Sequence, residues 1–158
     1  MPTKTNETDH LESYGWNELP EDIRLLLSKA QEAAENAYAP YSNFLVGCAL
    51  LLENGEILIG NNQENASYPA GICAERVVLA YAHANWPQNK PLRIAVVARR
   101  RDQESYSYVT PCGICRQTIA EYENKFNSPI EIYMLVPKGQ VLRASNIDQL
   151  LPFKFLDF

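Results

Sequence analysis

The chain lacks any apolar run long enough to cross a bilayer as a helix, which takes about 20 consecutive residues. Its first nineteen residues are polar and lack the apolar segment of a secretory signal peptide. We therefore expect neither a membrane span nor export, and we predict a cytoplasmic protein.

Positive charge is also scarce. The chain has 14 Lys and Arg against 19 Asp and Glu, which gives a formal net charge of −5. A polyanionic nucleic-acid backbone is a poor partner for such a chain. We therefore expect no nucleic-acid partner, whereas a small neutral ligand remains possible.

Histidine and cysteine are few, with two of the first and four of the second. We assign no role to His10, in the polar N-terminal stretch, or to His83, which lies far from Cys73 along a predicted helix. In a reducing cytoplasm the thiols stay free, so metal binding is favoured over disulfides.

The length of 158 residues fits one domain with a real core, and 46% of the residues are hydrophobic. The sequence shows no internal repeat and no linker. We predict a flexible N-terminal arm over residues 1–19 and a single catalytic domain over residues 20–158.

Apolar spacing and turn residues predict alternating helices and strands. Proline and two acids at residues 20–22 suit a helix start, and Pro40 is expected to end that helix. Asn54-Gly55 between two apolar runs predicts a tight hairpin. Ser145, with Asp148 three residues later, resembles a capping box for a short last helix. The other predicted helices cover residues 73–83 and 112–126, and the predicted strands cover residues 45–52, 57–60, 94–98, 130–136 and 141–142. This order indicates an α/β fold with a mixed sheet covered on both faces.

Two short stretches carry the chemistry: Cys-Ala-Glu-Arg at residues 73–76 and Pro-Cys-Gly-Ile-Cys-Arg at residues 111–116. Cys112 and Cys115 can converge on one ion, and Cys73 supplies a third sulfur. Three protein ligands leave the fourth tetrahedral position of a zinc ion open for water. Glu75 would then be the proton acceptor for that water. The alternative for Glu75 is a solvated glutamate on the helix surface. The alternative for the cysteines is a structural zinc site in which Cys48 is the fourth ligand.

Both stretches lie at predicted helix starts, where the helix dipole favours a thiolate. Three thiolates and Zn²⁺ sum to −1, which weakens the metal as a Lewis acid. Arg76 and Arg116, each following a motif, are candidates to donate to the thiolate sulfurs and offset this charge.

Together these motifs match a zinc deaminase signature in its three-cysteine form. With residues 40–47 (Pro-Tyr-Ser-Asn-Phe-Leu-Val-Gly) and 62–68 (Asn-Gln-Glu-Asn-Ala-Ser-Tyr), the chain resembles the small, homotetrameric Cys₃-type cytidine deaminases. The resemblance implies a three-layer α/β/α sandwich with a five-stranded mixed sheet. It also implies one Zn²⁺ per subunit, bound by Cys73, Cys112 and Cys115.

The implied reaction is hydrolytic deamination of cytidine and 2′-deoxycytidine to uridine and 2′-deoxyuridine plus ammonia, a step of pyrimidine salvage. In the resembling enzymes a zinc-bound hydroxide attacks C4, and Glu75 matches the proton shuttle. Arg76 would support the ligands from outside the coordination sphere.

The resemblance also implies the substrate contacts. Asn62 and Glu64 match positions that hold the ribose hydroxyls, Phe44 matches the aromatic beside the base, and Ala74 matches a further contact. Phe155 matches a C-terminal phenylalanine that reaches the site of a neighbouring subunit.

Other interpretations remain open at this stage. The alternative for Phe44 is a core residue under the loop, and contact with the base is favoured over it. The alternative for Phe155 is packing between subunits, which can coexist with a contact to the site. A deaminase of a cytosine-containing antibiotic such as blasticidin S shares the three-cysteine site, and a nucleic-acid deaminase is a more distant rival.

Overall fold

The computed structural model describes residues 10–156. Helices α1, α2 and α3 span Glu21–Ala34, Ala74–Asn85 and Gly113–Phe126. The strands are β1 (Glu12–Gly15), β2 (Phe44–Leu52), β3 (Ile57–Asn61), β4 (Pro91–Arg100), β5 (Glu131–Val136) and β6 (Gln140–Ala144). They form one mixed sheet in the order β1-β6-β5-β4-β2-β3, in which β4 and β5 are parallel and all other neighbours are antiparallel.

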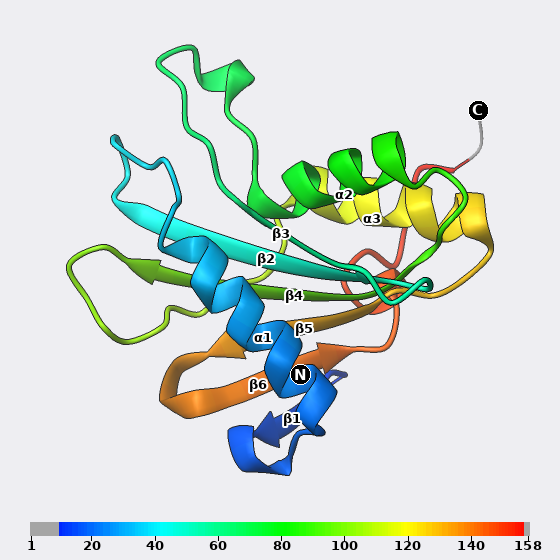
Figure 1. Cartoon of the computed structure of the whole chain (residues 1–158), viewed down its shortest axis with the longest axis horizontal. Helices are drawn as coiled ribbons and strands as arrows, with labels where there is room; N and C mark the ends of the chain where they lie inside the picture. The colour runs from blue at the N-terminus through cyan, green and yellow to red at the C-terminus, as the bar shows by residue number, and fades with distance from the viewer. Residues whose placement is uncertain (1–9, 157–158) are drawn as a thin grey trace, which may run out of the picture.

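Helices cover both faces of the sheet, with α1 on one face and α2 and α3 on the other (Figure 1). In β2, Cys48 and Leu50 belong to the core beneath α2 and α3, whereas Leu45 and Ala49 belong to the core beneath α1. This alternation is what a strand with both faces covered requires, since successive side chains point to opposite faces. The predicted three-layer α/β/α sandwich is confirmed.

Gly47 lets α1 lie directly against β2. A methyl group at Gly47 would lie 1.9 Å from the carbonyl oxygen of Ala30 and 2.6 Å from the backbone nitrogen of Ala34. The predicted hairpin after β2 is also present, and Gly55 takes the positive φ of 88° that its turn requires.

Within residues 10–156 the sheet has six strands, so the expectation of five was wrong by one. The added strand is β1, which pairs antiparallel with β6 from Glu12↔Arg143 to Gly15↔Gln140. It lies within the stretch that we predicted to be a flexible arm; the remainder of that arm, residues 1–9, is outside the described residues. The four residues of β1 lack apolar alternation, so the sequence gives no strand signal there. The strand forms by pairing with β6, which is distant along the chain.

Helix α1 ends at Ala34, earlier than the proline at position 40 suggested. The backbone nitrogen of Tyr38 donates to the Asn62 carbonyl, and the Glu64 nitrogen donates to the Tyr38 carbonyl. Pairing with this loop therefore takes the chain out of the helix before the proline. The cap of the short last helix also differs from prediction: Asn146, rather than Ser145, accepts from the Asp148 nitrogen.

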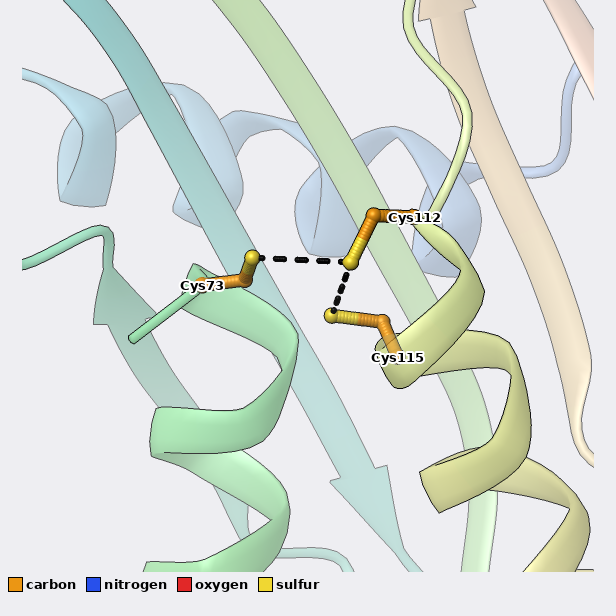
Figure 2. A group of neighbouring side chains, drawn as sticks. All are labelled: Cys73, Cys112 and Cys115. Carbon is orange, nitrogen blue, oxygen red and sulfur yellow. Dashed lines mark hydrogen bonds between the residues drawn. The ribbon is translucent and has the colours of Figure 1, made fainter. Parts of the chain in front are cut away.

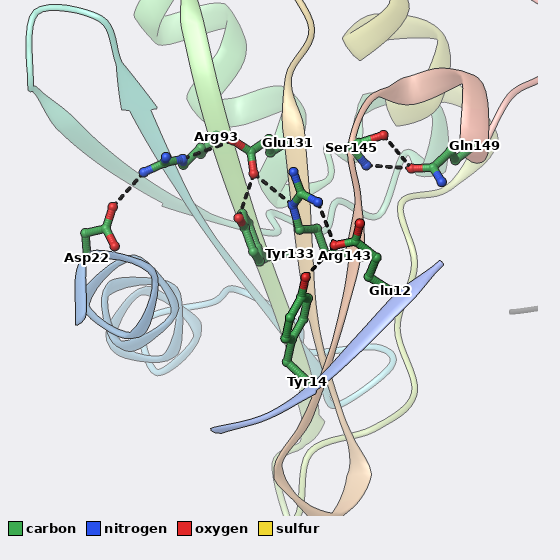
Figure 3. A network of polar contacts seen from close by, with 9 residues as sticks. All are labelled: Glu12, Tyr14, Asp22, Arg93, Glu131, Tyr133, Arg143, Ser145 and Gln149. Carbon is green, nitrogen blue, oxygen red and sulfur yellow. Dashed lines mark hydrogen bonds and ion pairs between the residues drawn. The ribbon is translucent and has the colours of Figure 1, made fainter. Parts of the chain in front are cut away.

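A network of charged side chains ties the edge of the sheet together (Figure 3). Glu131 of β5 accepts hydrogen bonds from Tyr133 Oη at 2.7 Å, Arg143 Nε at 2.9 Å and Arg93 Nε at 3.3 Å. Arg143 also donates to Glu12 of β1 at 2.6 Å. One half-buried carboxylate thus joins β4, β5 and β6, and through Arg143 it holds β1.

We predict that Glu131→Gln lowers the free energy of unfolding by about 1–3 kcal/mol near pH 7. Burial raises the pKa of Glu131, but hydrogen bonds from Tyr133 and Arg143 outweigh it and leave this pKa below its ordinary value of 4.5. A depressed folded pKa stabilises the protein above the unfolded pKa, and this stabilisation is lost as the pH falls through the folded pKa. The difference between variant and wild type should therefore shrink in acid.

Urea unfolding at about pH 7 and about pH 4 measures both effects. Glu56→Gln, which changes an exposed carboxylate in the hairpin turn, is the matched control. An equal difference between Glu131→Gln and wild type at both pH values would contradict the electrostatic explanation.

Candidate active site

The cysteines are positioned by the starts of two helices that lie side by side. Cys73 is the N-cap of α2 and Cys112 is the N-cap of α3. Cys115 lies one turn into α3 and is buried. The first backbone N–H groups of a helix have no partner within the helix, so both starts present partial positive charge to the thiols.

The three sulfur atoms converge, as predicted (Figure 2). The Sγ atoms of Cys73 and Cys112 are 3.7 Å apart, and those of Cys112 and Cys115 are 3.5 Å apart. All three lie within 4.8 Å of one another. Tetrahedral zinc with Zn–S bonds of about 2.3 Å separates its sulfur ligands by roughly 3.8 Å. The spacing therefore fits one zinc ion.

The cluster favours a negatively charged thiolate at Cys73. Interaction with the Cys115 thiol lowers the pKa of Cys73 to about 5 against the opposing effect of burial, and Cys112 and Arg76 assist. The same interaction with Cys73, together with burial, raises the pKa of Cys115. Because the site favours a thiolate even without a bound cation, it suits a metal that binds thiolates.

Glu75 follows Cys73 into the first turn of α2 and is only 3% exposed. Within residues 10–156 it is the one charged residue that is buried. Burial raises the pKa of Glu75 to about 7, and the negative charge of Cys73 adds to this, whereas its own backbone N–H and Cys115 act in the opposite direction. A buried carboxylate without a neighbouring ion pair is costly, which favours a functional role over a solvated one.

The two arginines that follow the motifs have different surroundings. Arg76 donates from Nη2 to the Gly71 carbonyl at 3.3 Å and helps to lower the pKa of Cys73. Its Nε atom is the buried side-chain donor within residues 10–156 that lacks a hydrogen-bond partner. Such a donor beside a thiol fits a site in which several thiolates surround a metal ion.

Arg116 does not have the role that we suggested for it. Its guanidinium donates to the Pro111 carbonyl at 2.7 Å, the Leu150 carbonyl at 2.8 Å and Thr110 Oγ1 at 3.1 Å. The group therefore holds the segment before Cys112 and the backbone at Leu150, and none of these three contacts is made to a thiol sulfur.

Cys48 is fully buried in β2 and lies outside the thiol cluster. Burial raises the pKa of its thiol well above the ordinary value. It is a small apolar core residue, as predicted, and the arrangement does not supply it as a fourth ligand.

A pocket of about 320 Å³ opens beside the cluster, which is within the range of small-molecule sites. Its lining brings together Cys73, Glu75 and Cys112 with Phe44, Asn62 and Glu64. The hairpin start and the loop after β3 thus deliver the predicted substrate residues to the predicted metal centre.

Asn62 and Glu64 also shape the pocket through hydrogen bonds of their own. Asn62 accepts from the Val46 nitrogen and donates to the Phe44 carbonyl, both at 2.9 Å. The Glu64 carboxylate accepts from the Tyr41 nitrogen at 2.9 Å and from the hydroxyl of Ser42. An amide has two donor hydrogens and a carboxylate about four acceptor sites, so each group keeps capacity for a ligand.

Four predicted residues lie outside this lining. The first, Cys115, is fully buried one turn into α3. Ala74 is fully buried in the core, so only its main chain is placed near the site. Arg76 acts on the site through its charge, which assists the Cys115 thiol in lowering the pKa of Cys73. Phe155 is 68% exposed, at the far end of the chain.

Sequence reasoning missed Ser42 and Thr110. The Ser42 hydroxyl accepts from the Phe44 nitrogen at 3.0 Å while it donates to Glu64, so it sets the position of both. Thr110 lines the pocket and receives a hydrogen bond from Arg116. The sequence did offer a signal for both residues. Ser42 lies within the Tyr-Ser-Asn-Phe run, and Thr110 directly precedes Pro111.

Fold and site define the class of protein: an α/β/α domain whose three-thiol centre and buried carboxylate fit a zinc-dependent hydrolase. The family model for the cytidine and deoxycytidylate deaminase zinc-binding region matches residues 20–126. The chain belongs to this family.

Similar proteins agree with this assignment. The chain is 37% identical over 134 residues to a protein named cytidine deaminase from Sporosarcina psychrophila, covering 85% of this chain and 91% of that protein. The crystal structure of cytidine deaminase from Burkholderia pseudomallei superposes with a TM-score of 0.71 at 36% identity, covering 87% of this chain and all of that chain. That from Mycobacterium tuberculosis gives a TM-score of 0.66 at 30% identity, covering 87% of this chain and all of that chain.

We predict that Cys112→Ala abolishes stoichiometric zinc binding, because it removes one of three sulfur ligands and leaves too few to hold the ion. Cys48→Ala is the matched control and should leave one zinc ion per chain. Metal analysis of purified protein, with thiol titration before and after zinc addition, checks both. Loss of zinc from Cys48→Ala would instead support a structural site with four cysteines.

We predict that Arg76→Gln retains zinc less tightly, by about 10-fold or more in competition with a chelator. The substitution removes the positive charge that offsets the excess negative charge of three thiolates. Arg101→Gln, an exposed arginine in a loop, is the control. If zinc retention and the pH–rate profile of Arg76→Gln both match wild type, Arg76 does not compensate the charge of the centre.

Proposed function

We propose that this protein deaminates cytidine and 2′-deoxycytidine hydrolytically to uridine and 2′-deoxyuridine, with release of ammonia, in pyrimidine salvage. The observation that carries the proposal is the position of Glu75. It is buried against a zinc-compatible thiol cluster, in the wall of a pocket that also holds Phe44, Asn62 and Glu64. Membership of the deaminase family supports the same reaction.

A zinc ion held by Cys73, Cys112 and Cys115 would supply Lewis acidity toward a water molecule at its open position. Glu75 lies two residues from one ligand and is excluded from bulk solvent, so it can hold a proton close to the reacting atoms. In this proposal Glu75 accepts a proton from the water as the water oxygen bonds to C4 of the pyrimidine, and it passes that proton to N3. Glu75 then takes the remaining proton of the new C4 hydroxyl and gives it to the amino group, so the C4–N bond breaks, ammonia leaves and C4 becomes the carbonyl of uridine.

The remaining pocket residues suit a nucleoside. Phe44 offers an aromatic face on which a base can stack, an interaction worth about 1–3 kcal/mol. Asn62 both donates and accepts, and Glu64 accepts, which matches the hydroxyl groups of a sugar. A neutral ligand is also compatible with a pocket in which Glu64 is held in its ionised form: hydrogen bonds, first from Ser42, lower the pKa of Glu64.

We further propose that the protein works as a homotetramer in the cytoplasm. Aromatic side chains stand out from the surface at Tyr68, Phe153 and Phe155, with exposed fractions of 79%, 94% and 68%. Apolar groups of this size usually mark a contact surface. A reducing compartment would keep the three ligand thiols available for zinc. No helix within residues 10–156 is long and apolar enough to cross a membrane.

We predict that Glu75→Gln keeps one zinc ion per chain and loses at least about 100-fold in kcat on cytidine, since it removes the acid–base group but no metal ligand. Ammonia release and metal content, measured on the same preparation, give both values. Glu56→Gln, an exposed carboxylate of the hairpin turn, should turn over like wild type. A Glu75→Gln variant as active as wild type would remove Glu75 from the mechanism.

A substrate panel separates the proposed reaction from its rivals. Cytidine and 2′-deoxycytidine should both be deaminated by wild type, faster than blasticidin S and faster than cytosine in a single-stranded oligonucleotide. Faster turnover of the antibiotic or of the oligonucleotide would transfer the assignment to that substrate.

A further inference from the structure

The loop before β2, residues 39–43, brings Ser42 against the carboxylate of Glu64. The Ser42 hydroxyl donates to one carboxylate oxygen, Oε1, and accepts from the Phe44 nitrogen at 3.0 Å. The other oxygen, Oε2, accepts from the backbone nitrogens of Tyr41 at 2.9 Å and Ser42 at 3.3 Å. Two neighbouring residues of one loop therefore determine how this carboxylate is oriented in the pocket.

These contacts decide which part of the carboxylate can still accept a hydrogen bond. Each carboxylate oxygen has about two acceptor sites. Two backbone N–H groups fill both sites of Oε2 in Glu64, whereas the Ser42 hydroxyl fills one site of Oε1. The remaining site lies on Oε1, so a ligand hydroxyl would share that oxygen with Ser42.

Asn62 keeps a complementary capacity beside it. Its Oδ1 accepts from the Val46 nitrogen and its Nδ2 donates to the Phe44 carbonyl, both at 2.9 Å. One amide hydrogen and one acceptor site are then left for a ligand. Because Asn62 and Glu64 line the same pocket, a sugar hydroxyl can accept from Asn62 while it donates to Glu64 Oε1.

The backbone of the loop has supports other than the Ser42 hydroxyl. Asn43 takes a left-handed φ of 54°, which asparagine adopts more readily than most residues. Its nitrogen donates to the Ala39 carbonyl at 3.1 Å, and its carbonyl accepts from the Arg101 nitrogen at 2.9 Å. Removal of the Ser42 hydroxyl should therefore release the Glu64 carboxylate while the loop stays folded.

We propose that Ser42 is a positioning residue for sugar recognition, whose hydroxyl holds Glu64 Oε1 where it accepts a hydroxyl group of the nucleoside sugar. The inference rests on the proposed function and deepens it. Discrimination between sugars with and without hydroxyl groups then depends on Ser42, which acts through Glu64. The Ser42 hydroxyl is also the first cause that lowers the pKa of Glu64, so it helps to keep the acceptor ionised.

Ser42→Ala tests the proposal with two substrates that carry the same base. We expect KM for cytidine to rise about 3- to 10-fold, the range for loss of one hydrogen bond, with kcat and zinc content near wild type. For 2′,3′-dideoxycytidine, which lacks both hydroxyl groups, kcat/KM should change by less than about 2-fold. A loss that comes through Phe44 would affect both substrates equally, because Phe44 is proposed to contact the base.

Two further variants separate the hydroxyl from the fold of the loop. Ser42→Thr keeps the hydroxyl at an exposed position and should recover most of the KM for cytidine. Ser28→Ala, a change of an exposed serine on α1, is the matched control and should behave like wild type. Equal losses on cytidine and 2′,3′-dideoxycytidine, or a wild-type KM for Ser42→Ala, would overturn the role in sugar recognition.

A double-mutant cycle then shows whether Ser42 acts through Glu64. In a Glu64→Ala background the carboxylate is absent, so Ser42→Ala should lower kcat/KM for cytidine by less than about 2-fold further. A full additional loss in that background would mean that Ser42 acts independently of Glu64, which contradicts the proposal but leaves the deaminase assignment intact. Wild-type protein without activity on either nucleoside would instead overturn the proposed function itself.

Discussion

The convergence of three thiols is the constraint on which the rest of the site depends. Sulfur atoms 3.5 and 3.7 Å apart could not all ionise without a cation between them, because like charges at this distance repel strongly. The fold satisfies the geometry by starting α2 and α3 side by side on one face of the sheet. The starts of two helix dipoles and the charge of Arg76 then act on the same cluster.

The same cluster acts on the buried Glu75, because burial raises the pKa of Glu75 and the negative charge of Cys73 adds to this. A carboxylate in the core normally needs an ionic partner, and none lies directly against it among the described residues apart from the charge of Arg76. A zinc ion would not change this, because three thiolates and Zn²⁺ still sum to −1. Burial and the negative charge of Cys73 therefore both favour the protonated form of Glu75, which suits a group that holds a proton beside the metal centre.

Much of the fold could be predicted from the sequence, because its signals are local. The Asn54-Gly55 turn, the apolar run of β2 and the cysteines at two helix starts depend on neighbouring residues. The errors arise where distant segments meet. Strand β1 exists because β6 offers an edge, and α1 ends early because Tyr38 pairs with the loop after β3. The residues next to each contact give no signal from which it could be predicted.

In the site, too, local features were predictable and contacts between distant segments were not. Cys73, Cys112, Cys115 and Glu75 were predictable because motif spacing determines where they lie on a helix. Arg76 and Arg116 occupy equivalent places after their motifs, yet one faces a thiol and the other binds three backbone or hydroxyl oxygens. The difference depends on which segment packs beside each helix start. For Arg116 that segment is the stretch at Leu150, more than 30 residues away along the chain.

The residues proposed for the chemistry and those proposed for substrate binding lie on different kinds of segment. The groups proposed for proton transfer and metal binding lie on helix starts above a buried sheet, where packing leaves them little freedom. The pocket that they share is walled by loops, and at about 320 Å³ it lies at the small end of the range for ligand sites. The loop that carries Asn62 and Glu64 is held by hydrogen bonds to the start of β2 and the segment before it, rather than by packing against the sheet. A change in these loops should therefore alter substrate binding while the geometry of the reacting groups, which the helix starts determine, stays the same.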